Sequence, residues 1–117
     1  MSRTFGDIES KLTDLGGIPG VVVCTPEITT FQYSSDIDYV LLGCDGIFDT
    51  LTNEMVNEVV WETVNFYKAN KKQLGSDSKT LTQCLNDIVN NVLKKSLISH
   101  SEDNVTVILV AFRDLLA

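Results

Sequence analysis

One apolar run in this chain ends abruptly in an acidic residue followed by glycine. Residues 39–44 read YVLLGC, and Asp45 and Gly46 follow directly. The run predicts a core strand, and a carboxylate at the end of a core strand is costly unless a cation, a metal or a hydrogen-bond donor pairs with it. Glycine at the next position lets the backbone turn sharply. The pattern is therefore typical of a site.

A mirror image of this pattern lies near the other end of the sequence. Residues 101–104 read SEDN, and the strand-like run VTVILVAF follows at residues 105–112. If the two strands pair in antiparallel fashion, the exit of the first lies beside the entrance of the second, roughly 5 Å away in the pairing direction. Asp45 and Asp103 would then share one edge of the sheet.

Two interpretations of these acids remain open on spacing alone. Two carboxylates with oxygen-bearing neighbours, and with no cluster of His or Cys, suit a hard divalent ion such as Mg²⁺ or Mn²⁺ rather than zinc. Alternatively, both acids are turn and cap residues, because Asp-Gly and Asp-Asn are ordinary ways to leave or enter a strand.

Three motifs in order make the chain resemble the carboxy-terminal part of the protein phosphatase 2C family, the metal-dependent serine/threonine phosphatases. The segments SRTFGD at 2–7, DGIFD at 45–49 and SEDNVT at 101–106 resemble the family patterns S-R-x-x-G-D, D-G-[IL]-[WF]-D and S-x-D-N-x-T. Pro26-Glu27 fits a further short landmark. The resemblance extends over residues 2–112.

The resemblance implies a two-metal centre that holds Mg²⁺ or Mn²⁺, with Asp45 and Asp103 among its ligands. In that family a metal-held water attacks phosphorus directly, and the substrate is a phosphoserine or phosphothreonine protein. Paired divalent ions suit this reaction because they lower the pKa of bound water and neutralise charge on the phosphoryl oxygens. The candidate supporting residues in the three motifs are Gly46, Asn104, Arg3, Asp7 and Asp49.

Other polar residues have competing interpretations. Asp49 either supports a third metal site or caps the helix that begins nearby, and we favour the cap. Arg3 is expected to support structure rather than phosphate. His100, the only histidine, is expected to be a solvated loop residue, because a titrating role needs placed partners. Cys44, which adjoins Asp45, is either a redox-sensitive thiol or a small buried hydrophobe, and we favour the buried hydrophobe.

The chain departs from the family in what precedes its first motif. The family's catalytic domain is more than twice as long, and its amino-terminal portion carries a D-G-H-G-G segment, an upstream acid and a phosphate-binding arginine that do not occur here. We therefore expect residues 1–117 to form a single, incomplete domain that is inactive alone, and we assign no general acid within it. The alternative is a non-catalytic piece, or a pseudophosphatase, that acts as a binding module.

Composition and charge argue against some classes of binding partner. The chain is 44 % hydrophobic and 21 % charged with a net charge of −7, which argues against a nucleic-acid or anionic-membrane surface. It contains no run near the roughly 20 apolar residues of a membrane span and no leader pattern. Three widely spaced cysteines without a C-x-x-C pair favour a reducing intracellular compartment, cytoplasmic or nuclear.

Hydrophobic periodicity predicts the remaining elements. Short strands are expected at residues 21–24 and 28–33 as well as at 39–44. Three- and four-residue spacing then predicts a helix over 52–71, capped by Thr52, and a second apolar stripe over 81–93. Residues 72–79 are expected to form a polar connector.

Together with the family likeness, this pattern predicts an α+β fold, a partial antiparallel β-sandwich with a flanking helix pair. Such a partial sandwich would leave strand edges and apolar sheet faces open. We therefore expect a homo-oligomer, or association with the absent amino-terminal half.

Overall fold

The structure, a computed structural model, describes residues 2–75 and 77–117 and divides the chain into two units, Met1–Tyr33 and Ser34–Ala117. Met1, and Ser76 of the expected connector, lie outside the described residues. Both acids at the strand ends belong to the second unit.

The first unit contains the short helix α1 (Ile8–Lys11) and the 3₁₀ helix η1 (Thr13–Leu15). The strands expected at 21–24 and 28–33 are wrong, because Val22 and Val23 form only isolated bridges and residues 28–33 have no regular structure. A strand needs a paired neighbour and a face to bury. None of the residues described between 2 and 33 is buried, so the β-branched runs have no core to pack against.

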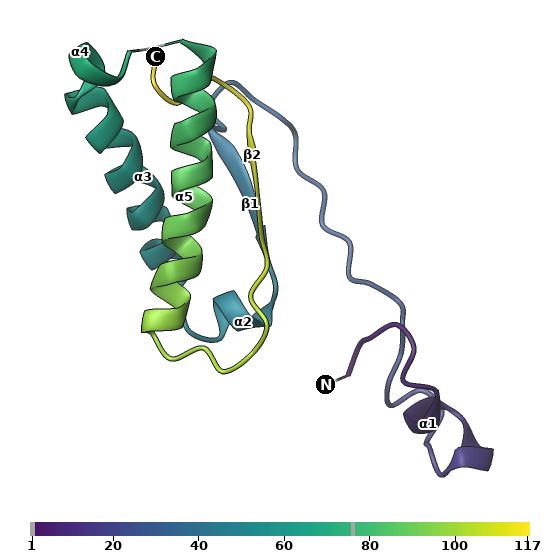
Figure 1. The fold of residues 1–117 in the computed structure, drawn as a ribbon. Helices are drawn as coiled ribbons and strands as arrows, with labels where there is room; N and C mark the ends of the chain where they lie inside the picture. The colour runs from purple at the N-terminus through teal and green to yellow at the C-terminus, as the bar shows by residue number, and fades with distance from the viewer. Residues whose placement is uncertain (1, 76) are drawn as a thin grey trace. The chain divides into compact units, whose positions relative to one another are not determined.

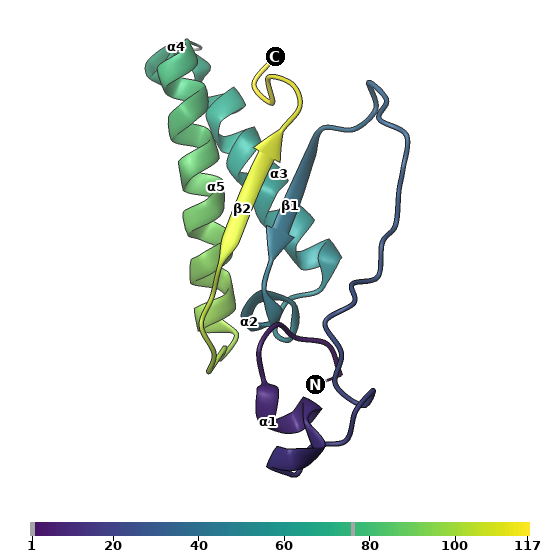
Figure 2. The ribbon, with the colours of Figure 1, turned by 90° about the vertical axis from the view of Figure 1, so that its right-hand side faces the viewer.

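Among its described residues, the second unit contains two strands, β1 (Tyr39–Gly43) and β2 (Val107–Ala111), with four helices between them in the chain. The strands pair in antiparallel fashion, with Leu41 opposite Leu109 and Gly43 opposite Val107. The helices are α2 (Asp45–Phe48), α3 (Asn53–Ala69), α4 (Lys71–Leu74) and α5 (Ser78–Ile98). Figures 1 and 2 show that α3 and α5 lie side by side over one face of the two-stranded sheet.

Both long helices begin at a side-chain cap. The Thr52 hydroxyl accepts a hydrogen bond from the Met55 amide at 3.3 Å, which confirms the predicted cap of α3. Asp77 caps α5 by accepting from the Thr80 amide at 2.9 Å. The connector is shorter than predicted, because residues 71–74 form α4 and α5 already begins at Ser78. Within the described ranges, no helix is long and apolar enough to cross a membrane.

The core lies between the helix pair and one face of the sheet. Val60, Val64 and Ile88 are fully buried, with Leu41 and Leu109 of the sheet packed against the same cluster. A second cluster joins Ile47 of α2 to Val92 of α5. The predicted apolar stripes of α3 and α5 are therefore confirmed as core contacts.

The opposite face of the sheet is apolar but exposed. Leu42, Ile108 and Val110 point to this face and are 55 %, 53 % and 44 % exposed. The described residues thus form a mixed α+β fold with one small antiparallel sheet and one helical layer. A second sheet, which a sandwich requires, would cover this face, and that part of the fold stays a prediction.

Candidate metal centre

The register of the sheet brings the two acidic motifs to the same end. Gly43 and Val107 are the last paired residues, and the Cys44 amide extends the ladder by donating to the Thr106 carbonyl at 3.2 Å. The predicted antiparallel pairing is therefore confirmed. Asp45 therefore follows the end of β1 at the same end of the sheet where the loop that carries Asp103 enters β2.

Gly46 lies close against the backbone of the second motif. A Cβ atom built on this buried residue would lie 2.3 Å from the carbonyl oxygen of Asn104, so any side chain here would displace backbone. The Gly46 amide also donates to Oδ1 of Asp45 at 3.0 Å. The glycine therefore lets the two segments of backbone pack closely, and its amide holds one oxygen of the preceding carboxylate.

The second motif repeats this arrangement. The Asn104 amide donates to Oδ1 of Asp103 at 2.7 Å, and the Asn104 carbonyl accepts from the Cys44 thiol at 3.1 Å. Cys44 is half-buried and its sulfur also accepts from the Thr106 amide at 3.3 Å. The expectation that Cys44 is simply a buried hydrophobe is therefore wrong, because the residue is only half-buried and its thiol is hydrogen-bonded to two backbone groups of the facing loop.

Two serine hydroxyls hold the carbonyl oxygen of Gly46. Ser96 of α5 donates at 2.8 Å and Ser101 of the following loop at 2.7 Å. The Ser96 side chain is fully buried, and its hydroxyl lies 3.3 Å from that of Thr50. Sequence reasoning missed Ser96, although a polar residue in the α5 stripe after Cys84, Ile88 and Val92 was a usable signal.

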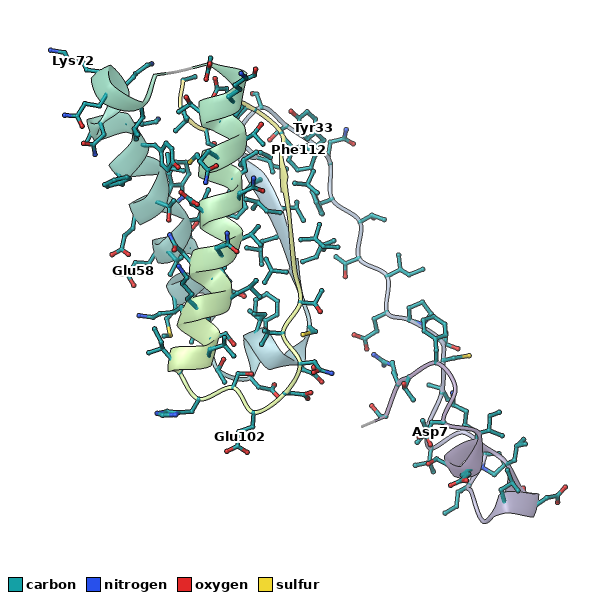
Figure 3. All side chains as sticks on the ribbon, viewed as in Figure 1. Asp7, Tyr33, Glu58, Lys72, Glu102 and Phe112 are labelled. Carbon is teal, nitrogen blue, oxygen red and sulfur yellow. The ribbon has the colours of Figure 1, made fainter. Side chains whose placement is uncertain are left out.

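A shallow hollow of about 380 Å³ opens beside these motifs. The Asp103 loop forms one side of it, and Figure 3 shows Glu102 at the tip of that loop. His100 in the same loop is exposed and adopts a positive φ of 64°, as a loop residue can. The lining residues are Gly46, Asp49, Thr50, His100, Ser101, Glu102 and Asp103.

Asp49 does not cap the helix that follows it. Thr52 occupies the cap position of α3, while Asp49 directly follows α2 as its C-terminal cap residue, where its amide donates to the Asp45 carbonyl at 2.8 Å. The cap interpretation of Asp49 is therefore wrong. Its exposed carboxylate lines the hollow instead.

The side chains at this end of the sheet are of the type that a hard cation prefers, but there are too few of them to complete its coordination. Asp45 and Asp103 are exposed carboxylates, and oxygen ligands are those that Mg²⁺ and Mn²⁺ prefer. Across residues 2–75 and 77–117, however, no three His, Cys, Asp or Glu side chains converge closely enough to form a ligand group. An octahedral ion held here would need further ligands.

Arg3 and Asp7 belong to the first unit, where both make local contacts. The Arg3 guanidinium pairs with Glu27 at 2.6 Å, and Arg3 also bridges Val23 through the backbone. This pair joins the SRTFGD segment to the Pro26-Glu27 landmark, which supports the structural role expected of Arg3. Asp7 has a left-handed backbone, with φ of 49°, and accepts from the Ser10 hydroxyl at 2.9 Å.

Comparison with known proteins identifies the family. The sequence model described as Protein phosphatase 2C matches residues 1–105. Probable protein phosphatase 2C 60 of Arabidopsis thaliana is 29 % identical over 120 residues, which cover 97 % of this chain and 29 % of that protein. Protein phosphatase 1B of Rattus norvegicus is 30 % identical over 113 residues, covering 96 % of this chain and 25 % of that protein.

A shorter match reaches a fungal relative. Protein phosphatase 2C homolog 3 of Schizosaccharomyces pombe is 35 % identical over 60 residues, or 51 % of this chain and 14 % of that protein. No solved structure gives a significant match. The chain belongs to the protein phosphatase 2C family, and it spans less than a third of the length of these relatives.

Proposed function

We propose that this chain supplies part of the catalytic centre of a Mg²⁺- or Mn²⁺-dependent protein phosphatase that acts on phosphoserine and phosphothreonine. One observation carries the proposal: the antiparallel register that ends at Gly43 and Val107 brings the two acidic motifs of the family to one end of the sheet. Membership of the protein phosphatase 2C family supports the reaction class.

Within this proposal, Asp45 and Asp103 are the metal ligands. The amides of Gly46 and Asn104 each bond one oxygen of the preceding carboxylate, which limits the rotation of both side chains before any ion binds. When bound, divalent ions supply activation of water and neutralisation of charge on the phosphoryl group. Asp49, which lines the same hollow as Asp103, is a further oxygen donor that such an ion could recruit.

The number of ligands sets the expected behaviour of the chain alone. Mg²⁺ demands nearly ideal octahedral coordination, and two carboxylates fill only part of it. We therefore expect residues 1–117 to bind Mn²⁺ weakly and not to turn over phosphoester. Further ligands, and a second sheet over the apolar face, would come from other parts of a longer protein. The free cysteines favour a reducing intracellular location.

The test is Mn²⁺-dependent hydrolysis of p-nitrophenyl phosphate by this chain. Asp45→Asn removes one proposed ligand, and Glu102→Gln is the matched control because it removes the same charge from an exposed residue next to Asp103 that is not a proposed ligand. We expect no activity above buffer in any of the three proteins. Activity that Asp45→Asn abolishes and Glu102→Gln retains would show a working centre and overturn the expected inactivity.

Calorimetric titration with Mn²⁺ then separates the phosphatase interpretation from a non-catalytic one. Binding that Asp45→Asn weakens at least about tenfold, with Glu102→Gln close to wild type, supports a metal-binding role. If wild type and both variants bind Mn²⁺ equally weakly, the metal role fails. The binding-module alternative would then be the better account.

A further inference from the structure

Ser96 is a buried hydroxyl placed among core residues of α5. It is fully buried, and it continues the stripe that includes Ile88 and Val92. A buried polar group is costly unless it is hydrogen-bonded. Ser96 meets this requirement by donating to the Gly46 carbonyl at 2.8 Å, which is the backbone of the proposed metal motif rather than of its own helix.

Two hydroxyls share this one acceptor. Ser101 donates to the same Gly46 carbonyl at 2.7 Å, from the loop that leads to Asp103. A carbonyl oxygen has two lone pairs, so the two serines satisfy it completely. Gly46 is thus fixed both to α5 and to the loop of the second acidic motif.

The fixed residue is also the one that holds the carboxylate of Asp45. Its amide donates to Oδ1 of Asp45 at 3.0 Å, while its carbonyl is held by the two hydroxyls. Glycine has more backbone freedom than any other residue, so a glycine that must keep one conformation benefits from external hydrogen bonds. Without them, the Asp45-Gly46 turn has more freedom to move relative to Asp103.

We propose that Ser96 and Ser101 are positioning residues of the candidate metal centre, which hold the Asp45-Gly46 turn in place against the Asp103 loop. The proposal rests on the proposed function for its metal, but its geometric part is independent of any ion. Neither serine touches the ion; both act through Gly46. The Ser96 hydroxyl makes helix α5 part of the support of the site, and the Ser101 hydroxyl adds the loop that follows the helix.

The test compares Ser96→Ala and Ser101→Ala with Thr63→Val. Thr63 carries a buried hydroxyl between α3 and α5, which donates to the Val59 carbonyl and accepts from Asn91. Thr63→Val therefore shows the general effect of removing a buried hydroxyl from the same helix pair, away from Gly46. Urea unfolding first confirms that each variant is folded. Amide hydrogen exchange at Gly46 is then measured by NMR without metal, and Mn²⁺ affinity by calorimetry.

We expect Ser96→Ala to speed exchange at Gly46 and to weaken Mn²⁺ binding about tenfold, the cost typical of losing a supporting hydrogen bond behind a ligand. Ser101→Ala should act in the same direction, and Thr63→Val should change neither quantity even if it destabilises the protein. Unchanged exchange at Gly46 in both serine variants would overturn the proposal.

The Asp45→Asn background shows whether Ser96 acts through Asp45. If it does, Ser96→Ala causes no further loss of Mn²⁺ affinity in Asp45→Asn, whereas an equal loss in both backgrounds contradicts the route through Asp45. If wild type itself binds no Mn²⁺, the proposed function fails, and the metal-free exchange at Gly46 alone decides whether the serines hold the turn.

Discussion

Gly43 of β1 faces Val107 of β2 at the final position of the antiparallel ladder. Each strand therefore ends or begins beside the other, and the residues just beyond this pair are the two acidic motifs. The close approach of Gly46 to the Asn104 carbonyl, where a Cβ would lie 2.3 Å from oxygen, belongs to the same junction. The junction, rather than either motif alone, defines the candidate site.

Gly46→Ala should disrupt this junction. The new methyl group would meet backbone, which cannot rotate away, so we expect a loss of roughly 1–3 kcal/mol in the free energy of unfolding, as for overpacked cores. Gly43→Ala is the control, because its Cβ would meet mainly the side chain of Phe48 at 2.8 Å, which is 41 % exposed and can move. Urea unfolding measures the loss in the free energy of unfolding for both variants. Equal losses would contradict the assigned role of Gly46.

Thr52→Ala should weaken the start of α3. The hydroxyl satisfies the Met55 amide at 3.3 Å, and loss of such a cap typically costs about 1 kcal/mol. Thr52→Asp keeps an oxygen acceptor at the cap and should restore most of that loss. Chemical denaturation of the three proteins tests this, and an alanine variant as stable as wild type would show that the cap contributes nothing.

The exposed sheet face should cause self-association. Leu42 and Ile108 are 55 % and 53 % exposed on an apolar face, and both strands are edges of a two-stranded sheet. The double variant Leu42→Thr with Ile108→Thr should shift sedimentation toward monomer at micromolar concentration. Leu97→Gln, at a residue of α5 that is 56 % exposed, should not. A compact wild-type monomer would contradict this prediction.

Stability should fall at high pH through Tyr67. Burial, together with the hydrogen bond that Tyr67 donates to Asp87 at 2.7 Å, raises the pKa of Tyr67 from 10.0 to about 12. The folded state therefore holds the proton more tightly than the unfolded state. The resulting contribution is complete below pH 10 and is lost as the pH rises toward 12.

Tyr67→Phe isolates this contribution. The variant should be less stable than wild type at pH 8, and the difference should shrink between pH 10 and pH 12, the window set by the two pKa values. Urea midpoints of both proteins across this range provide the measurement. A constant difference at every pH would show that Tyr67 does not titrate as described.

The parts of the fold that follow from local pattern could be predicted from the sequence. The three- and four-residue spacing predicted α3 and α5, the threonine cap predicted the start of α3, and the two apolar runs beside acidic motifs predicted β1 and β2. Residues 21–24 and 28–33 have similar β-branched character, but strand formation depends on a partner that local sequence does not specify.

The candidate site also has residues that could be predicted from the sequence and residues that could not. The acids at the strand ends could be placed by topology, whereas Ser96 could not, because its partner Gly46 lies fifty residues earlier in the chain. The role expected of Asp49 failed because Thr52, three residues later, is a competing cap. Local sequence shows which residues are able to cap or ligate, but packing decides which of them do.

Paramagnetic broadening by Mn²⁺ in the NMR spectrum of this chain tests the shared site in one titration. If Asp45 and Asp103 hold one ion, the amide signals of Gly46 and Asn104 should broaden in parallel at low Mn²⁺, before signals of exposed acids elsewhere such as Asp14. Asp45→Asn should reduce the effect at both positions. Broadening at only one of the two motifs, or at neither, would contradict a metal site built by this junction.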